Sequence, residues 1–268
     1  MDAIENIADV IAAHHGHLLL AVMGFDGVLV EYDGDPGNVR LSSERRALLS
    51  TFGERADVAL AIVSGRRVNE LRQCVSLGLR VFYIGLHGLE IEGRDISRVE
   101  RQAFDTCRGP VHDIVTILGA SLSSVAGVRV EDKEVAVAVH TREAGPGDAV
   151  WARVHLLSTA ARVARHDELR ILRGNHVLEL LPNIDRPRTT AIAELGEHLE
   201  IRDNRPVFTL YVGDDVPDDD AFNAIPGAGI SVAVGERAPK ARFHLTSPAD
   251  VWRLVERLAA ARMREGCP

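Results

Sequence analysis

Apolar residues along this 268-residue chain occur mainly in short runs. Runs bounded by turn or polar residues are found at 18–23, 58–63, 81–84, 207–212 and 229–234. Short apolar runs of this kind are typical of parallel strands that are buried on both faces. Segments with the apolar spacing of helices lie between them, near 2–14, 42–52, 67–74, 189–199 and 249–261. The order of strands and helices predicts a doubly wound parallel sheet of the α/β class.

The pattern changes in the middle of the chain. Helices are expected from about 95 to 107, from Pro110 onward and over 149–164, and strands over 128–133, 135–139, 169–172 and 177–181. Gly174-Asn175 separates the last two of these strands, which indicates a hairpin. We therefore expect residues 98–184 to form a smaller α+β domain, inserted into a core domain of residues 1–97 and 185–268.

Composition and charge exclude several classes of function. The net charge is −8 and no basic run occurs, which argues against a nucleic-acid partner. No apolar stretch reaches the roughly 20 residues that a membrane helix needs, and the acidic N-terminus does not resemble a signal peptide. Three widely spaced cysteines indicate free thiols in a reducing compartment. We therefore expect a cytoplasmic monomer that binds neither nucleic acid nor membrane.

Polar residues follow the predicted strands at their carboxyl ends. Asp26 follows the run at 18–23, Ser64 follows the run at 58–63, and an acidic segment at 214–220 follows the run at 207–212. Arg188 stands at the start of a helix. Alone, Ser64 reads as a helix cap and the acidic segment as a solvated helix start. Because the carboxyl ends of parallel strands share one edge, the combination favours a phosphate site with Mg²⁺.

Several stretches resemble motifs of the trehalose-6-phosphate phosphatase family, within the haloacid dehalogenase superfamily. They are Val63-Ser-Gly-Arg66, residues 83–90, Glu131-Asp-Lys133 with His140-Thr-Arg142, residues 174–182 and residues 211–222. The resemblance extends over nearly the whole chain. It implies a haloacid dehalogenase-like, Rossmann-like core with an inserted cap domain. It also implies Mg²⁺-dependent hydrolysis of trehalose 6-phosphate, a small-molecule sugar phosphate, to trehalose and phosphate.

The resemblance also implies roles for individual residues. It implies that Asp26 is the general acid/base and that its backbone contacts the metal. The other implied magnesium ligands are Asp214, Asp215 and Asp218. Ser64 and Arg188 are implied to contact the phosphate. The implied cap residues, which would hold the sugar, are Glu131, Lys133, Glu179 and Arg142.

The departures from the family pattern lie mostly at the phosphate. Gly24 stands where the family has its aspartate nucleophile, and Val28 replaces a threonine. Further along the chain, Arg188 replaces a lysine, Thr189 a glycine and Pro217 a threonine. No side chain at Gly24 can form an acyl phosphate. Because loss of a covalent nucleophile commonly costs about 10⁴ to 10⁶ in turnover, the sequence predicts impaired catalysis.

Two questions stay open at this stage. The first motif has an alternative register at Glu31-Tyr-Asp-Gly34, which would require a very short strand at 27–30. Three functions also remain: a working trehalose-6-phosphate phosphatase, a non-catalytic sugar-phosphate binder or regulatory relative, and a phosphatase for another sugar phosphate with an altered mechanism.

Overall fold

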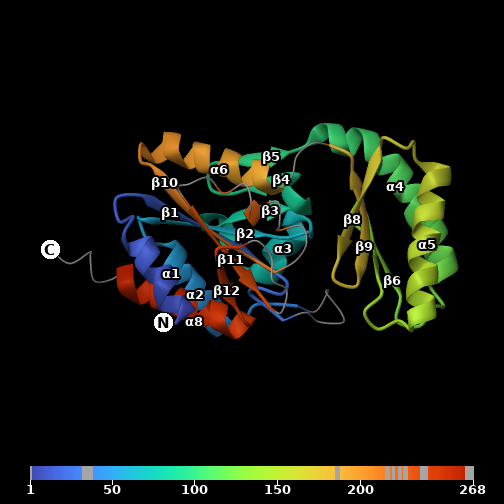
Figure 1. Cartoon of the computed structure of the whole chain (residues 1–268). Coiled ribbons are helices and arrows are strands. Elements are labelled where there is room, and N and C mark those ends of the chain that lie inside the picture. The colour runs from blue at the N-terminus through green and yellow to red at the C-terminus, as the bar shows by residue number, and fades with distance from the viewer. Residues whose placement is uncertain are drawn as a thin grey trace. The chain divides into compact units, whose positions relative to one another are not determined.

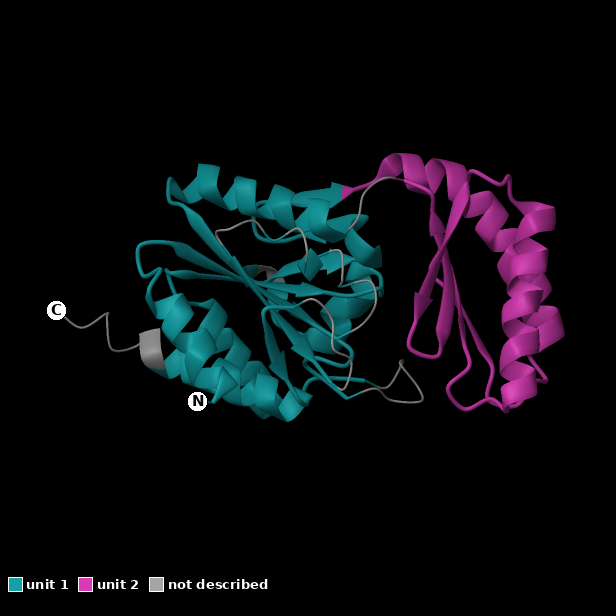
Figure 2. Ribbon diagram, in the orientation of Figure 1, with its two compact units in different colours: residues 1–98, 186–268 teal, residues 99–185 magenta. Residues whose placement is uncertain are grey.

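The computed structural model describes residues 2–31, 39–184, 188–214, 218, 221–222, 225, 229–235 and 241–262. The chain divides into two compact units (Figure 2). Unit 1 consists of Met1–Arg98 and Arg186–Pro268, and unit 2 consists of Val99–Asp185. Unit 2 is thus formed by one continuous segment that interrupts the sequence of unit 1.

A mixed sheet with the strand order β12-β11-β10-β1-β2-β3-β4-β5 forms the framework of unit 1 (Figure 1). The strands β12 to β3 pair in parallel, and β4 pairs antiparallel with β3. This arrangement confirms the predicted α/β class and its doubly wound parallel sheet. The strand bounds are β1 (Leu18–Gly24), β2 (Val58–Val63), β3 (Phe82–Gly85), β4 (Glu90–Glu92), β5 (Ser97–Val99), β10 (Val207–Gly213), β11 (Gly229–Val234) and β12 (Phe243–Leu245).

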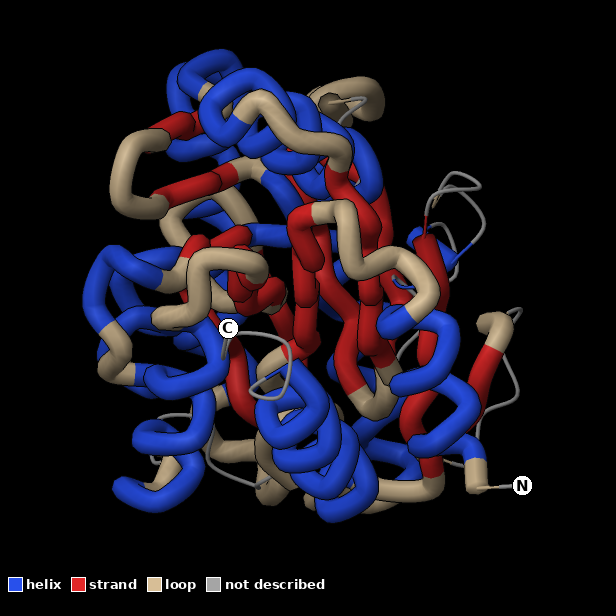
Figure 3. The backbone as a smooth tube through the Cα atoms, turned by 90° about the vertical axis from the view of Figure 1, so that its left-hand side faces the viewer, coloured by secondary structure: helices blue, strands red, loops and turns tan. Residues whose placement is uncertain are grey.

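Helices lie on both faces of this sheet (Figure 3). They are α1 (Ala3–Ala12), α2 (Ser43–Gly53), α3 (Val68–Val75), α6 (Arg188–Asp203) and α8 (Pro248–Arg262). The side chains of Asp2 and Ser42 accept backbone N–H groups in the first turns of α1 and α2, which fixes where these helices begin. In the described part of the chain, no helix is long and apolar enough to cross a membrane.

Strand β1 separates two hydrophobic cores. Leu19, Ala21 and Met23 pack in one core, together with apolar residues of α1, α2, α3 and α8. Leu18, Leu20 and Val22 point the other way and pack in a second core with residues of α6. Every apolar side chain of β1 is at most 2% exposed. Burial on both faces therefore holds the carboxyl end of β1 in a fixed position.

Unit 2 contains a four-stranded antiparallel sheet and two helices. The strand order is β6-β7-β9-β8. The elements are β6 (Arg129–Asp132), β7 (Val137–His140), β8 (Leu169–Gly174), β9 (Val177–Pro182), α4 (Arg101–Leu122) and α5 (Pro146–Val163). The two helices pack against each other and against β7, so they cover one face of the sheet (Figure 1). The hairpin predicted at Gly174-Asn175 joins β8 to β9.

Helix α4 differs from the sequence prediction. A break was expected at Gly109-Pro110, but a single helix runs from Arg101 to Leu122 with Pro110 inside it. The buried positions continue at helical spacing through the break, at 103, 104, 107, 111, 114, 118 and 122. Burial of this apolar stripe therefore outweighs the hydrogen bond that Pro110 cannot donate. Cys107 of this helix and Cys74 of α3 are free, buried thiols.

Candidate functional site

The carboxyl ends of β1, β2 and β10 lie side by side in unit 1. Strand β1 pairs in parallel with both neighbours, and Gly24 is opposite Val63 while Met23 is opposite Val212. This register brings the segments that follow Gly24, Val63 and Gly213 to one edge of the sheet. Because β1 ends at Gly24, the central strand does not extend to the alternative motif near Glu31. Tyr32 to Gly34 of that alternative lie outside the described residues.

Gly24 stands in a space that a neighbouring side chain already fills. A Cβ atom at residue 24 would lie 2.8 Å from Cγ2 of Val28, which is closer than ordinary van der Waals contact. Val28 is fully buried, and a tight turn brings it back over the strand end. In this turn, Gly27 has a φ of 77° and its N–H donates to the carbonyl of Val30 at 2.8 Å. Val28 therefore packs where the side chain of a nucleophile would begin.

Asp26 is held by Arg66, which follows β2. Nε of Arg66 donates to Oδ2 of Asp26 at 2.9 Å, and Nη2 donates to Oδ1 at 2.9 Å. Nη1 of Arg66 donates to Oε1 of Glu70 at 2.5 Å. Burial alone would lower the pKa of Arg66, but the hydrogen bonds and charge of Asp26 raise it above its usual value. Both oxygens of the proposed general acid/base are therefore engaged by one cation.

Ser64 lies in the turn between β2 and α3. Its hydroxyl oxygen accepts a hydrogen bond from the backbone N–H of Arg66 at 3.1 Å, and the residue is 6% exposed. The carbonyl of Ser64 accepts the N–H of His87 at 3.2 Å. The hydroxyl group is thus fixed at the sheet edge, close to the Asp26 and Arg66 pair.

Arg188, at the start of α6, joins three buried groups. It pairs with Asp218 and donates to the hydroxyl of Tyr211 at 3.3 Å. Nη2 of Arg188 lies 2.8 Å from Nδ1 of His87. Because a guanidinium group can only donate, this nitrogen of His87 accepts the hydrogen bond and the ring is neutral. Burial and the nearby charge of Asp218 raise the pKa of Tyr211, so its hydroxyl stays protonated.

The carboxylate of Asp218 is occupied on both oxygens. Oδ1 accepts from Arg188 and from the hydroxyl of Tyr211, the latter at 2.5 Å. Oδ2 accepts the backbone N–H of Asp214 at 2.9 Å. Asp215, which the resemblance assigns to magnesium, lies outside the described residues. Asp218 thus serves as an internal counter-ion in the structure.

These contacts decide whether the described residues fit a magnesium ion. Mg²⁺ prefers carboxylate and other hard oxygen ligands in octahedral geometry. Gly24 offers no carboxylate, and Oδ1 of Asp218 already accepts a hydrogen bond from Arg188. Among the described residues, no group of three or more His, Cys, Asp and Glu side chains could hold a metal ion. Residue 24 and Asp218 therefore do not provide the carboxylate ligands that Mg²⁺ prefers in this structure.

A second polar cluster lies on the sheet of unit 2. Nζ of Lys133 donates to Oε1 of Glu179 at 2.8 Å, and Oε2 of Glu131 lies 4.0 Å from the same Nζ. Glu131 also contacts Nε2 of His140 at 2.6 Å. Burial would raise the pKa of Glu131, but the charge of Lys133 and the bond to His140 lower it to about 2. Arg142, by contrast, is exposed and donates to the carbonyl of Asn175.

Several residues of these clusters were not among the sequence-based candidates. Arg66, His87, Tyr211 and His140 all contact a candidate residue. Each lies inside a stretch that resembles the family, which is the signal that could have found them. Glu90 has a structural role, because its carboxylate accepts the N–H of Val68 at 2.7 Å at the start of α3.

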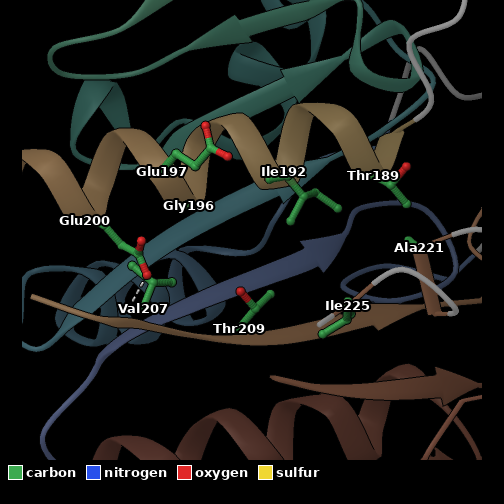
Figure 4. Close-up of a pocket in the computed structure, with 10 residues that line it drawn as sticks. Thr189, Ile192, Gly196, Glu197, Glu200, Val207, Thr209, Ala221 and Ile225 are labelled. Carbon is green, nitrogen blue, oxygen red and sulfur yellow. Dashed lines mark hydrogen bonds between the residues drawn. The ribbon is translucent and has the colours of Figure 1, made fainter. Parts of the chain in front are cut away.

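A cavity of ≈ 220 Å³ lies between α6 and β10 and extends along α6 from Thr189 to Glu200 (Figure 4). Its lining is mostly apolar, with Ile192, Val207 and Ile225 among its residues. The charged groups in the lining are the carboxylates of Glu197 and Glu200, and Glu200 accepts the N–H of Val207 at 3.0 Å. Because carboxylates repel phosphate, this cavity does not suit a phosphorylated ligand.

Comparison with known proteins identifies the family. The sequence profile described as trehalose-phosphatase matches residues 22–248. The chain belongs to the trehalose-phosphatase family. A trehalose-phosphate phosphatase of Mycolicibacterium paratuberculosis is 32% identical over 266 residues, which cover 96% of this chain and 65% of that protein. The chain thus spans less than two thirds of the length of this curated relative.

Solved structures show how widely the fold of this trehalose-phosphatase family member is shared. A trehalose-6-phosphate phosphatase related protein superimposes with a TM-score of 0.77 at 20% identity, covering 92% of this chain and 99% of that one. The C-terminal domain of a Candida albicans trehalose synthase regulatory protein superimposes with a TM-score of 0.65 at 10% identity, covering 93% and 97%. At these identities the similarity concerns the fold alone, and the fold does not distinguish catalysis from regulation.

Proposed function

We propose that this trehalose-phosphatase family member binds a sugar phosphate of the trehalose 6-phosphate class and lacks the covalent route of hydrolysis. The observation that carries the proposal is Gly24 at the end of β1, with Val28 packed where a nucleophile side chain would begin. A carboxylate nucleophile divides phosphate hydrolysis into two easier steps through an acyl phosphate. Without this carboxylate, no side chain at position 24 can accept the phosphoryl group in the first step.

The remaining groups at this edge support binding of a phosphate. Ser64 offers a hydroxyl at the sheet edge, where it accepts the backbone N–H of Arg66. Arg66 and Arg188 add two guanidinium groups, which are paired with Asp26 and Asp218 in this structure. Guanidinium groups suit phosphate oxygens in charge and in geometry. We propose that Ser64 and Arg188 contact the phosphate.

We propose that Asp26 orients Arg66 in this chain. The oxygens of Asp26 that would move a proton already accept hydrogen bonds from Arg66. The proposed general acid/base is therefore poorly placed to activate a water molecule. In unit 2, Glu131, Lys133 and Glu179 are proposed to hold sugar hydroxyls, as the family resemblance implies.

We propose that magnesium binding is weak in this chain. The family resemblance implies Asp214, Asp215 and Asp218 as ligands, but Asp218 is paired with Arg188 and no carboxylate exists at Gly24. A ligand that binds the folded state tightly raises the melting temperature. Addition of about 10 mM MgCl₂ is expected to raise it by less than about 1 °C. A clear, saturable increase in the melting temperature would contradict weak binding.

The competing function is that of a working trehalose-6-phosphate phosphatase, which the name of the 32% identical relative favours. Two measurements on purified protein separate the functions: phosphate release from trehalose 6-phosphate with MgCl₂, and calorimetric titration with trehalose 6-phosphate. We expect binding, with turnover about 10⁴-fold or more below ordinary enzyme rates of 1 to 10³ s⁻¹. Turnover of about 1 s⁻¹ would show a working enzyme. Absence of binding at about 10 mM ligand would contradict the binding proposal.

A further inference from the structure

An arginine-lined cavity lies in unit 1 at the amino ends of β1, β2 and β3. This is the edge of the sheet opposite to Gly24, Ser64 and Asp218, since Leu18 and Val58 begin their strands here. The cavity has a volume of ≈ 760 Å³. Its charged lining residues are Arg55, Arg80, Arg94, Arg202, Arg205, Glu54 and Asp203.

The lining of this cavity is positive although the chain as a whole is negative. Five arginines and two carboxylates line the cavity, while the chain has a net charge of −8. Two of these arginines are paired with carboxylates, Arg55 with Asp57 at 3.0 Å and Arg202 with Asp203 at 2.6 Å and Asp95 at 3.2 Å. Arg205 donates to the backbone carbonyls of Gly16 and His17, at 3.1 and 2.9 Å, and its charge also acts on the carboxylate of Asp203. The side chain of Arg80 is 73% exposed and lies 3.5 Å from Glu54. A dissolved anion can therefore reach guanidinium groups from several segments.

A purely structural explanation accounts for only part of this cluster. Helix C-termini attract cations, and α2 and α6 both end at this edge. The last turn of α2 contains no basic residue, and that of α6 contains only Arg202. Arg80 and Arg94 come instead from the segments before β3 and after β4. Stabilisation of helix ends thus does not explain why these arginines surround one cavity.

We propose that this cavity binds a small polyanion that carries at least two phosphate groups. Arginine forks bind phosphate oxygens in pairs, and several forks around one hollow favour several anionic groups over one. The volume lies within the roughly 300–1,000 Å³ of small-molecule sites. The site lies at the opposite end of the strands from Gly24, so it does not depend on the proposed function. Inorganic tripolyphosphate, which presents only phosphate groups, is the appropriate probe.

The test is calorimetric titration of the full chain with tripolyphosphate at low ionic strength. The double variant Arg80→Gln/Arg94→Gln is expected to weaken binding about tenfold or more, because two guanidinium groups are removed from the cavity. The matched control is Arg165→Gln. The Arg165 side chain is 77% exposed, lies 3.6 Å from Asp167 and belongs to unit 2. Its removal is expected to change the dissociation constant less than about twofold.

Three results would overturn the proposal. The first is undetectable binding of tripolyphosphate to the unmodified chain at about 1 mM. The second is an equal loss of affinity in the Arg165 control, which would indicate general attraction by surface charge. The third is a combination of two observations: saturating trehalose 6-phosphate displaces tripolyphosphate, and the double variant binds tripolyphosphate as tightly as the unmodified chain. This result would place the anion at the sheet edge near Gly24 and Ser64. Unchanged melting temperatures of both variants would show that a loss of affinity is not caused by unfolding of the variant.

Discussion

Arg66 donates to both carboxylate oxygens of Asp26, with its Nε 2.9 Å from Oδ2 and its Nη2 2.9 Å from Oδ1. The same guanidinium group donates to Glu70 of α3 through Nη1. Its side chain is 5% exposed, so one buried cation neutralises carboxylates from two different elements. The pair ties the segment after β1 to the start of α3 and makes Asp26 part of the framework of the site.

This pair is expected to couple strongly in a double-mutant cycle. With Arg66→Gln, Asp26→Asn and the double variant, urea unfolding should give a coupling free energy of about 1–3 kcal/mol. The control cycle uses Arg257 and Glu5, whose two oxygens accept from Nε of Arg257 at 2.9 and 3.0 Å on the surface. Exposed pairs couple by less than about 1 kcal/mol. Equal coupling in both cycles would refute a special role for Arg66.

Restoring the nucleophile is expected to require two substitutions. Gly24→Asp alone brings Cβ to 2.8 Å from Cγ2 of Val28, and overpacking of this kind costs about 1–3 kcal/mol. In the double variant Gly24→Asp/Val28→Thr, the threonine hydroxyl at position 28 replaces a larger methyl group of valine. This hydroxyl can also donate a hydrogen bond to the new carboxylate at position 24. We expect phosphate release from trehalose 6-phosphate to increase about 100-fold or more only in the double variant. Val28→Thr alone is the control and should leave the rate unchanged. If the double variant gains no activity, the other departures at this edge are decisive.

The stability of the chain in acid is expected to depend on Glu131. Its pKa is lowered to about 2 by Lys133, His140 and Arg129, against the effect of burial. The stabilisation from its charge is complete above the unfolded pKa, near 4.5, and is lost as the pH falls towards 2. In urea unfolding between pH 7 and pH 2.5, the free energy of unfolding should therefore fall less in Glu131→Gln than in the unmodified chain. Asp167→Asn, at a side chain 54% exposed, is the control and should follow the unmodified chain. Parallel curves for all three proteins would contradict the prediction.

Gly65→Ala is expected to weaken sugar-phosphate binding through His87. A Cβ at residue 65 would lie 2.5 Å from Nε2 of His87, so the ring must move and its contact with Arg188 is lost. We expect the affinity for trehalose 6-phosphate to fall about tenfold or more in calorimetric titration, because Arg188 loses a positioning partner. The control is Gly119→Ala in α4, where a new Cβ meets no atom within 4 Å. This control should stabilise the chain by about 0.5–1 kcal/mol and leave affinity unchanged. Unaltered affinity in Gly65→Ala would exclude a positioning role for His87.

The sequence predicted the framework better than the contacts within it. The runs at 58–63 and 229–234 coincide with β2 and β11, because a short and mostly apolar stretch has few alternatives to a buried strand. The break expected at Pro110 was wrong, since a local rule for proline ignored burial of the whole helix face. Contacts between distant residues were out of reach, because they depend on the path of the chain in space. Asp26 and Arg66 are 40 residues apart, and Arg188 and His87 are 101 residues apart.

The placement of Gly24 at the last position of β1 has a consequence for the evolution of this chain. The burial that stabilises β1 comes from Leu18 to Met23, and position 24 adds no side chain to either core. Selection for folding therefore does little to keep an acidic residue at position 24. Only selection for catalysis would keep an acidic residue there. Once catalysis is no longer selected, drift at position 24 is nearly neutral for the fold. A single Gly24→Asp change would nevertheless be unfavourable, because its Cβ would lie 2.8 Å from Cγ2 of Val28.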